Sequence, residues 1–345
     1  MTMHRPVVTA ILLGAAVALS IADPRAAASA QQVQMKIAHI VPAQAPRGRG
    51  ATELAGLINA DERCDVAARV FPSAQLGGDT DLIEGLQIGS VEMVILPGSF
   101  LVGFQPLIGI LDFPFFFPPR REDVERVHRS EAMRLVLDTT EEKGIVSLAI
   151  WHTGFKVWTS NLRPLDVFEN YPGLKARVMP SVVLREQARL FGLTAVGMPF
   201  SETYSALQTG AIDAQENSIT TNFFMKFHEV QDFVAETNHG TLDQVIMVSK
   251  QWWDGRSVQC RDAIREAVDA GARTTSDLTY SIINSLALPA FEARGLEISR
   301  PSDENWQRMR DAVLPGIERL YVEQNGARGQ AILDAFEVEI AKYVN

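Results

Sequence analysis

Short apolar runs alternate with amphipathic stretches along most of the chain, a pattern typical of α/β lobes built on mostly parallel sheets. The first half of this pattern predicts strands at 35–41, 66–71, 93–96 and 145–151, and helices at 51–60, 79–88 and 121–143. In the last helical segment, Val124, Val127, Leu135 and Val136 share one predicted face, and Gly144 supplies the stop. These elements together predict one α/β lobe.

The same alternation restarts after Trp151, which indicates a second lobe. Strands are predicted at 155–160, 174–179 and 211–215, with helices at 181–191 and from a cap at Ser201 onward. A helical pattern from 258 to about 288 exceeds the usual length of a globular helix and is long enough to run across both lobes. We therefore expect a two-lobed α/β fold with hinge strands and one long helix spanning both lobes.

The N-terminus has the pattern of a secretory signal peptide. His4 and Arg5 precede an apolar stretch over 7–22, and the small residues of 28–30 match a signal peptidase site. The stretch is shorter than the roughly 20 residues that span a bilayer, so a retained anchor is the weaker interpretation. We expect cleavage near Ala30, with cleavage after Ala28 as an alternative, and a periplasmic mature protein.

Composition narrows the classes of partner. The 345-residue chain is 46% hydrophobic with a formal net charge of −10, so nucleic acid and anionic membranes are not expected partners. Cys64 and Cys260 are the only cysteines, and in an oxidising compartment they form either one disulfide or two buried thiols. The sequence leaves that choice open.

The sequence contains no complete dinucleotide-binding or zinc-protease motif. Gly48 and Gly50 are followed by Glu53 where a dinucleotide fingerprint needs glycine, and His228-Glu229 lacks the second histidine of a zinc protease because Asp232 takes its place. We therefore expect no enzyme activity, no cofactor and no metal site. The other histidines of the mature chain are scattered and are interpreted as hydrogen-bonded or exposed: His39, His128, His152 and His239.

Several unusual segments occur in a fixed order: FPSAQLGGD (71–79), LDFPF (111–115), GLKARV (173–178), MPFSETYSALQTG (198–210), AIDAQEN (211–217) and KFHEVQ (226–231). In this order they resemble the DctP family, the substrate-binding subunits of tripartite ATP-independent periplasmic (TRAP) transporters. The resemblance covers nearly the whole mature chain. It implies a monomeric receptor that binds a small organic carboxylate between two closing lobes and delivers it to a TRAP membrane permease.

The resemblance also implies the two-lobed periplasmic binding protein fold. We expect the signal peptide at 1–30, lobe I at 31–153 plus 243–282, lobe II at 154–242 plus 300–335, and the long bridging helix at 258–290.

Candidate ligand-binding residues follow from strand ends and from the resemblance. Arg177 ends a predicted strand, where ligands bind in open α/β sheets, and its guanidinium matches a carboxylate with two hydrogen bonds. The alternative for Arg177 is an ion pair with a nearby acid. The resemblance makes Arg177 the principal anchor and Asn217 a second hydrogen-bonding group. Phe200, just before a predicted helix, is positioned to cover the ligand, or simply belongs to the core.

Four further residues complete the predicted site. Lys156 stands where many relatives have a second arginine, and it either contacts a carboxylate, helps to neutralise the first one, or lies at the lobe surface. Trp158 is expected to line an apolar part of the pocket. Asp79 and Ser99 are expected to close the cavity from lobe I. The first lobe lacks the glutamate of sialic-acid binders, which favours a simpler organic acid with an apolar or aromatic part.

Two other functions stay open at this stage. A periplasmic ligand sensor that partners a signalling protein would share the fold and the site, and an enzyme acting on an organic acid is the less favoured alternative. Which organic acid is bound does not follow from the sequence.

Overall fold

The protein is described by a computed structural model that covers Thr2 and residues 33–343. The predicted signal peptide and both candidate cleavage sites lie, apart from Thr2, outside the described residues. Among the described residues, no helix is both long and apolar enough to span a membrane.

The strands of the described region are β1 (Val33–Ala38), β2 (Val66–Phe71), β3 (Met93–Pro97), β4 (Ile145–Ser160), β5 (Lys175–Val178), β6 (Thr194–Gly197), β7 (Ala214–Ser218), β8 (Phe233–Ala235), β9 (Thr241–Ser249) and β10 (Glu297–Ser299). The helices are α1 (Pro46–Ala60), α2 (Asp79–Ile88), α3 (Arg121–His128), α4 (Glu131–Leu137), α5 (Val182–Leu190), α6 (Thr203–Gln208), α7 (Ile219–Phe224), α8 (Lys250–Asp254), α9 (Val258–Ile282), α10 (Leu288–Arg294) and α11 (Asp303–Ile340). The mixed α/β fold expected from the sequence is confirmed.

Strand β4 connects the two halves of the sheet, the first made of β1, β2, β3 and β9 and the second of β5, β6, β7, β8 and β10. The strand order is β2-β1-β3-β9-β4-β7-β5-β6, with β8 pairing β4 and β10. The first part of β4 is antiparallel to β9, and its last residues pair with β7 and β8 instead. The ladder shifts between His152 and Phe155, where Gly154 adopts a positive φ of 97° that glycine tolerates best. The sequence predicted two separate strands here, whereas one continuous strand passes from one half to the other.

Apolar side chains fill the first half of the sheet on both faces. All five residues of β3 and all nine of β9 are buried, which explains the fully apolar sequence of β3 and the apolar run from Val245 to Val248 in β9. Cys64, in the loop before β2, forms a disulfide with Cys260 at the start of α9, 196 residues away. This settles the choice that the sequence left open.

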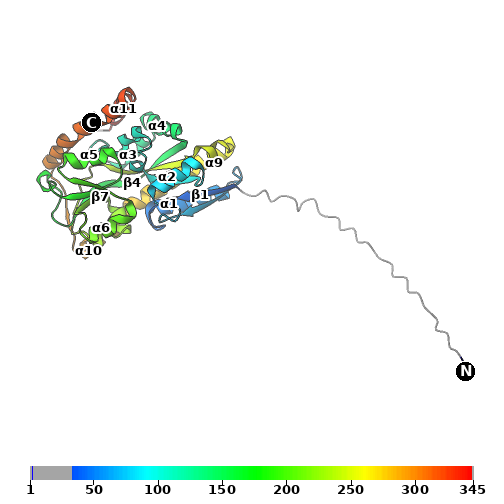
Figure 1. Cartoon of the computed structure of the whole chain (residues 1–345), viewed down its shortest axis with the longest axis horizontal. Helices are drawn as coiled ribbons and strands as arrows, with labels where there is room; N and C mark the ends of the chain where they lie inside the picture. The colour runs from blue at the N-terminus through cyan, green and yellow to red at the C-terminus, as the bar shows by residue number, and fades with distance from the viewer. Residues whose placement is uncertain (1, 3–32, 344–345) are drawn as a thin grey trace. The chain divides into compact units, whose positions relative to one another are not determined.

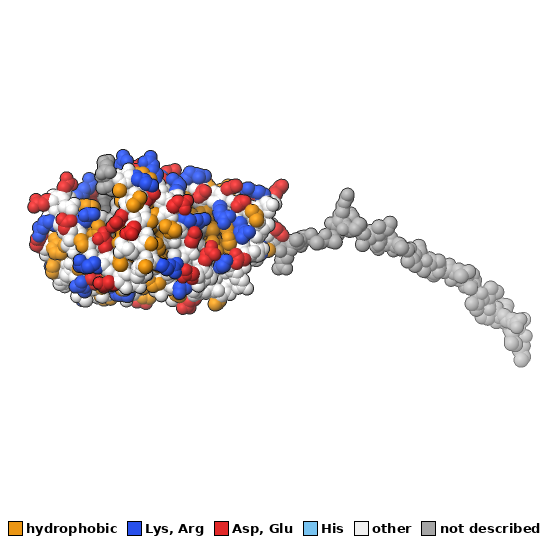
Figure 2. Space-filling model, turned by 90° about the horizontal axis from the view of Figure 1, so that it is seen from above, with side chains coloured by type: hydrophobic (Ala, Val, Ile, Leu, Met, Phe, Trp, Pro, Cys, Tyr) orange, Lys and Arg blue, Asp and Glu red, His pale blue; other side chains and the backbone are white. Residues whose placement is uncertain are grey.

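The long helices cover the sheet and join its halves (Figure 1). Helix α9 packs on α1 and β4, and it continues through a π-helical turn at Ile283–Ala287 into α10. Helix α11 packs on α5 from one half and on α4 from the other, with a kink at Gly326. Figure 2 shows basic and acidic side chains interspersed on the face drawn, so no single sign of charge dominates there.

Several predicted elements need correction. The predicted helix at 121–143 is broken after His128, because Ser130 caps a new helix, α4, through the N–H of Met133 at 3.3 Å. Leu135 is 53% exposed and does not belong to the buried face predicted for it. Helix α1 begins at Pro46, five residues before the predicted start.

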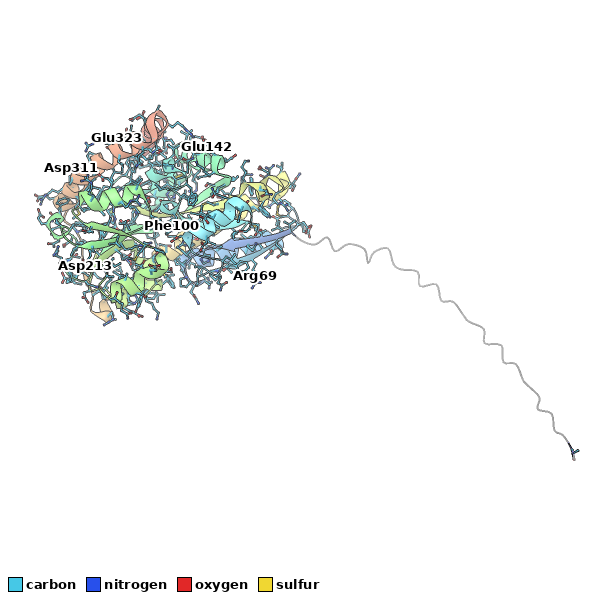
Figure 3. The ribbon with its side chains drawn as sticks, in the orientation of Figure 1. Arg69, Phe100, Glu142, Asp213, Asp311 and Glu323 are labelled. Carbon is cyan, nitrogen blue, oxygen red and sulfur yellow. A yellow bond between two sulfur atoms is a disulfide. The ribbon has the colours of Figure 1, made fainter. Side chains whose placement is uncertain are left out.

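Figure 3 shows Arg69 of β2 and Asp213 beside β7 toward opposite ends of the sheet, with Phe100 between them.

Candidate functional site

Strands β5 and β7 bring two of the predicted ligand-binding residues to one face of the sheet. Arg177 of β5 pairs in register with Gln215 of β7, and the alternation of side chains puts Asn217 on the same face as Gln215. The Asn217 amide donates a hydrogen bond to Gln215 Oε1 at 2.6 Å, which fixes its orientation. Because β5 and β7 are parallel, both residues lie near the same carboxyl edge of the sheet, where α/β folds bind ligands.

Arg177 is buried without an acidic partner. Its side chain is 1% exposed, and Nη2 donates only a long hydrogen bond of 3.4 Å to the carbonyl of Met198. Within residues 33–343, no acceptor lies within hydrogen-bonding distance of Nε and no carboxylate within 4 Å of the guanidinium. Burial lowers the pKa of Arg177 to about 10, against the raising effects of Asp79 and Glu216. A buried cation of this kind is stabilised most by an anion that takes up its free N–H groups.

Phe200 and Asp79 form a contact between the two halves of the sheet, beside Arg177. The Arg177 guanidinium lies 5.6 Å from the centroid of the Phe200 ring, a cation–π contact, and the Phe200 backbone N–H donates to Asp79 Oδ2 at 3.4 Å. Asp79 is the first residue of α2, whereas Phe200 opens a short helical turn before α6. The predicted cap at Ser201 is wrong, since α6 starts at Thr203 with Glu202 at its N-cap and without a side-chain cap.

A cavity of about 240 Å³ lies at this junction. Its walls come from both halves of the sheet: Ile40, Pro42, Ser73, Ala74, Gly78, Asp79, Pro199, Phe200, Ser201 and Met225. Ser73 and Ala74 both adopt left-handed backbone conformations, with φ of 54° and 58°, which non-glycine residues rarely take. Such conformations cost energy and often occur where a loop must present its backbone to a ligand.

Lys156 and Trp158 lie on the opposite face of the sheet from Arg177 and Asn217. In β4, Trp158 pairs with Glu216 and Val157 pairs with Asn217, so Lys156 and Trp158 share the face of Glu216. Trp158 is fully buried and stacks on His239 with ring centroids 5.3 Å apart. The prediction that Lys156 and Trp158 contact the ligand stays untested, but the suggestion that Lys156 lies at the surface is wrong, because it is 1% exposed.

Lys156 takes part in a buried network centred on Glu216. Lys156 Nζ lies 3.3 Å from Glu216 Oε1, while His239 Nε2 and Gln187 Nε2 lie 2.7 and 2.8 Å from Oε2. Burial alone would raise the pKa of Glu216, but Lys156, His239 and Gln187 hold it at about 2. The charge of Lys156 is therefore balanced inside the protein.

Ser99 follows β3 and is 2% exposed. Its hydroxyl donates to Asp112 at 2.5 Å, and burial raises the pKa of that carboxyl group. Ser99 thus has an internal partner, and its contact with a ligand stays a prediction.

The structure also reveals a second buried arginine that the sequence reasoning missed. Arg47, in the first turn of α1, is 5% exposed and donates to the carbonyl of Ile95 at 3.3 Å, while its Nε has no partner among the described residues. Burial lowers the pKa of Arg47 to about 9. His39 is fully buried nearby, and burial together with the Arg47 charge lowers its pKa to about 3. The available signal was Pro46, since proline favours the first position of a helix.

Arg47 lines a second cavity, which shares Met225 with the cavity of Asp79 and Phe200. This smaller cavity has a volume of about 20 Å³ and is also lined by Thr153, Thr220 and other residues. Each half of the sheet thus contributes one buried guanidinium, Arg47 or Arg177, that has no ion-pair partner among the described residues.

Comparison with known proteins gives matches over most of the chain. The C4-dicarboxylate-binding periplasmic protein DctP of Rhodobacter capsulatus is 35% identical over 345 residues, covering 98% of this chain and 100% of that protein. A TRAP periplasmic solute binding protein of Shewanella oneidensis with bound succinate has a TM-score of 0.82 at 30% identity, covering 90% of this chain and 98% of that one. A TRAP periplasmic solute binding protein of Desulfovibrio salexigens with bound orotic acid has a TM-score of 0.84 at 28% identity, covering 90% and 99%.

The family that matches is described as bacterial extracellular solute-binding protein, family 7, or DctP, and the match spans residues 37–324. The structural likeness covers 90% of the chain and includes the two-lobed arrangement of these receptors. On these grounds the chain belongs to the DctP family of bacterial extracellular solute-binding proteins.

Proposed function

We propose that this receptor binds a small organic acid with two carboxylates, one anchored by Arg177 and the other attracted by Arg47. As a member of the DctP family, the chain is a periplasmic solute receptor that delivers a small organic carboxylate to a TRAP membrane permease. The proposal concerns the class of acid and the residues that hold it.

The single observation that carries the proposal is the state of Arg177. A guanidinium that is 1% exposed, next to Asn217 and Phe200 and without an ion pair among the described residues, is costly unless an anion joins it. A carboxylate supplies the charge and the two acceptor oxygens that match its geometry.

The second arginine favours a dicarboxylate. Arg47, from α1 in the first half of the sheet, is also buried, and no acid of the described residues pairs with it. Two relatives support this class, since one is named for C4-dicarboxylate binding and another holds succinate. In this proposal Lys156 and Trp158 stabilise the opposite face of the sheet, and Asp79 lines the cavity from the first half, while Ser99 stays hydrogen-bonded to Asp112.

Binding is proposed to close two lobes around the acid. We place lobe I at 31–153 plus 243–282 and lobe II at 154–242 plus 300–335, with the helix at 258–290 between them. The pairing of β4 supports this division, because β4 pairs with β9 up to Phe155 and with β7 from Lys156 onward. Closure excludes water, which strengthens the ion pair between Arg177 and the carboxylate.

The test is a ligand screen with the protein exported to and purified from the periplasm. Native mass spectrometry first identifies any acid that copurifies, and thermal shift then compares succinate, malate and fumarate with matched monocarboxylates such as butyrate. We expect dicarboxylates to give the larger stabilisation, since at equal ligand concentration a tighter ligand stabilises the folded protein more, with the logarithm of the concentration over Kd. Equal shifts with butyrate and succinate would contradict the dicarboxylate proposal.

A receptor must return its ligand unchanged. After incubation with the bound acid, the protein is denatured and the released molecule is identified by mass spectrometry. We expect the intact acid, because the proposed site positions a cationic clamp and no reacting pair. Release of a converted product would instead establish an enzyme.

A further inference from the structure

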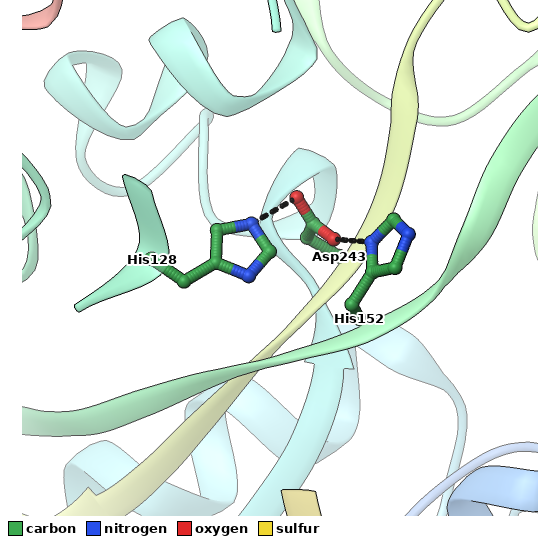
Figure 4. A group of neighbouring side chains, drawn as sticks. All are labelled: His128, His152 and Asp243. Carbon is green, nitrogen blue, oxygen red and sulfur yellow. Dashed lines mark hydrogen bonds and ion pairs between the residues drawn. The ribbon is translucent and has the colours of Figure 1, made fainter. Parts of the chain in front are cut away.

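Three buried side chains from distant parts of the chain meet where β4 and β9 pair (Figure 4). His128 Nε2 lies 2.8 Å from Asp243 Oδ2, and His152 Nδ1 lies 2.8 Å from Asp243 Oδ1. The three side chains are exposed by only 4%, 0% and 1%, in the order His128, His152, Asp243. Their ligand atoms all lie within 4.8 Å of one another.

Asp243 has an unusual charge balance. Within the described region its only ion-pair partners are the two histidines, and neither Arg nor Lys lies within 4 Å of its carboxylate. A buried carboxylate is most stable with a permanent cation beside it.

We propose that His128, His152 and Asp243 form a binding site for one first-row divalent metal ion, with Zn²⁺ as the reference ion. Two imidazole nitrogens and one carboxylate oxygen are a set that Zn²⁺ and other first-row ions favour. On metal binding, the nitrogens that now face Asp243 give up their protons or shift them to the opposite ring atom, and their lone pairs bind the ion. This site is separate from the acid-binding cavity described above.

The surroundings suit this role. Tyr280 of α9 hydrogen-bonds His152 Nε2 at 2.9 Å, and a partner on the far ring nitrogen is what orients metal-binding histidines. A cavity of about 220 Å³ is lined by His128 and His152, so two of the three proposed ligands border open space. Glu125, one turn before His128 on α3, lines the same cavity, but its carboxylate is held by Arg121 at 2.8 Å and by Ser276.

The position of the cluster gives metal binding a structural consequence. His152 and Asp243 are directly paired residues of β4 and β9, immediately before the shift in the ladder. His128 belongs to α3, so a bound ion would join α3 to both β4 and β9. We therefore expect the ion to raise the stability of the protein.

The experiment uses protein without a polyhistidine tag, purified from the periplasm and stripped with a chelator. Zn²⁺ uptake is measured by competition with a chromogenic chelator and by elemental analysis, and Co²⁺ is added as a spectroscopic probe. We expect one equivalent of Zn²⁺, a visible Co²⁺ absorption band from nitrogen and oxygen ligands, and a higher melting temperature with Zn²⁺.

Two conservative variants separate metal binding from folding. Asp243→Asn and His128→Gln keep similar size and polarity, and each is expected to lower Zn²⁺ affinity by more than about tenfold, the loss caused even by outer partners of a metal site. His228→Gln, a histidine outside the cluster, serves as the matched control and keeps full uptake. Circular dichroism checks that each variant is folded.

The proposal is overturned if the stripped wild-type protein takes up no Zn²⁺ and shows no Co²⁺ band. It is equally overturned if folded Asp243→Asn and His128→Gln both bind as tightly as wild type. Should one variant fail to fold, the other variant and the wild-type Co²⁺ spectrum decide the question.

Discussion

The guanidinium of Arg177 lies 5.6 Å from the centroid of the Phe200 ring, while no carboxylate of the described residues pairs with it. The ring shields one side of the cation from water, and the free Nε–H marks the edge that is left for a ligand. An arginine that served only the fold would be expected to have an acid beside it. The geometry therefore favours binding over a purely structural role.

Replacing Arg177 tests this role directly. Arg177→Ala is expected to weaken binding of the preferred acid by about 2–5 kcal/mol, as when one partner of a desolvated charge pair is removed. Arg177→Lys keeps the charge but loses the planar fork, so its loss should be smaller. Isothermal titration calorimetry measures both. Arg189→Ala, which removes an exposed arginine paired with Glu186, is the control, and tight binding by Arg177→Ala would refute the anchor.

Arg47 should determine the preference for two carboxylates. Arg47→Gln is expected to reduce affinity for succinate by at least about tenfold while affecting butyrate little, because only the dicarboxylate presents a second charge. The control is Arg49→Gln, two residues further along α1 and exposed. Equal losses for both acids in Arg47→Gln would show that the residue supports the fold and does not select the ligand.

How far the sequence predicted this molecule depends on whether the signal was local. Strand β2 and helix α2 were predicted at their observed bounds. The apolar periodicity lies within each segment, and turn residues mark its ends. Arg177 was recognisable from its place at a strand end and from the family resemblance. The face of the sheet on which Trp158 lies could not be recognised, because it depends on the register between β4 and β7.

Other features depend on contacts between distant segments. His128, His152 and Asp243 are separated by 24 and 91 residues, so no spacing rule connects them. Arg47 was missed because the predicted helix began at Ala51, which left the arginine in a presumed loop. Its burial becomes visible only when α1 is packed against the sheet.

The Glu216 network should matter more for stability than for ligand contact. Lys156→Met leaves Glu216 buried without its cation, so we expect a loss of about 3–5 kcal/mol in the free energy of unfolding. The double variant Lys156→Met/Glu216→Gln should lose less, because no lone charge remains. Urea denaturation measures both, and Lys226→Met, which breaks an exposed pair with Glu229, should cost under about 1 kcal/mol.

The same variant distinguishes support from a ligand clamp. If Lys156 contacted a carboxylate directly, Lys156→Met would weaken dicarboxylate binding as strongly as Arg47→Gln. We expect succinate affinity to change less than in Arg47→Gln, measured at a temperature where the variant remains folded.

Acidification should destabilise the protein through its buried histidines. Burial, assisted by the charge of Arg47, lowers the pKa of His39 to about 3, and burial also lowers the pKa of His239 despite the nearby Glu216. In the unfolded chain a histidine takes up a proton near pH 6.5. The unfolded state therefore binds more protons below about pH 6.5, and stability falls as the pH decreases from there toward 3.

Thermal melts of the ligand-free protein at pH 7.5 and pH 5 measure this effect. The melting temperature should be lower at pH 5, and His39→Gln should reduce the difference, because it removes one group that takes up a proton on unfolding. An unchanged difference in His39→Gln would show that His39 does not contribute.

The disulfide between Cys64 and Cys260 should stabilise the first half of the sheet. It ties the loop before β2 to the start of α9 across 196 residues, and a cross-link over so long a loop restricts the unfolded chain strongly. Replacing both cysteines with serine is expected to cost about 2–5 kcal/mol in the free energy of unfolding. Urea denaturation with and without reductant measures the loss. Reductant should destabilise the wild-type protein and leave the double serine variant unchanged, and equal stability of the oxidised wild type and the variant would contradict the prediction.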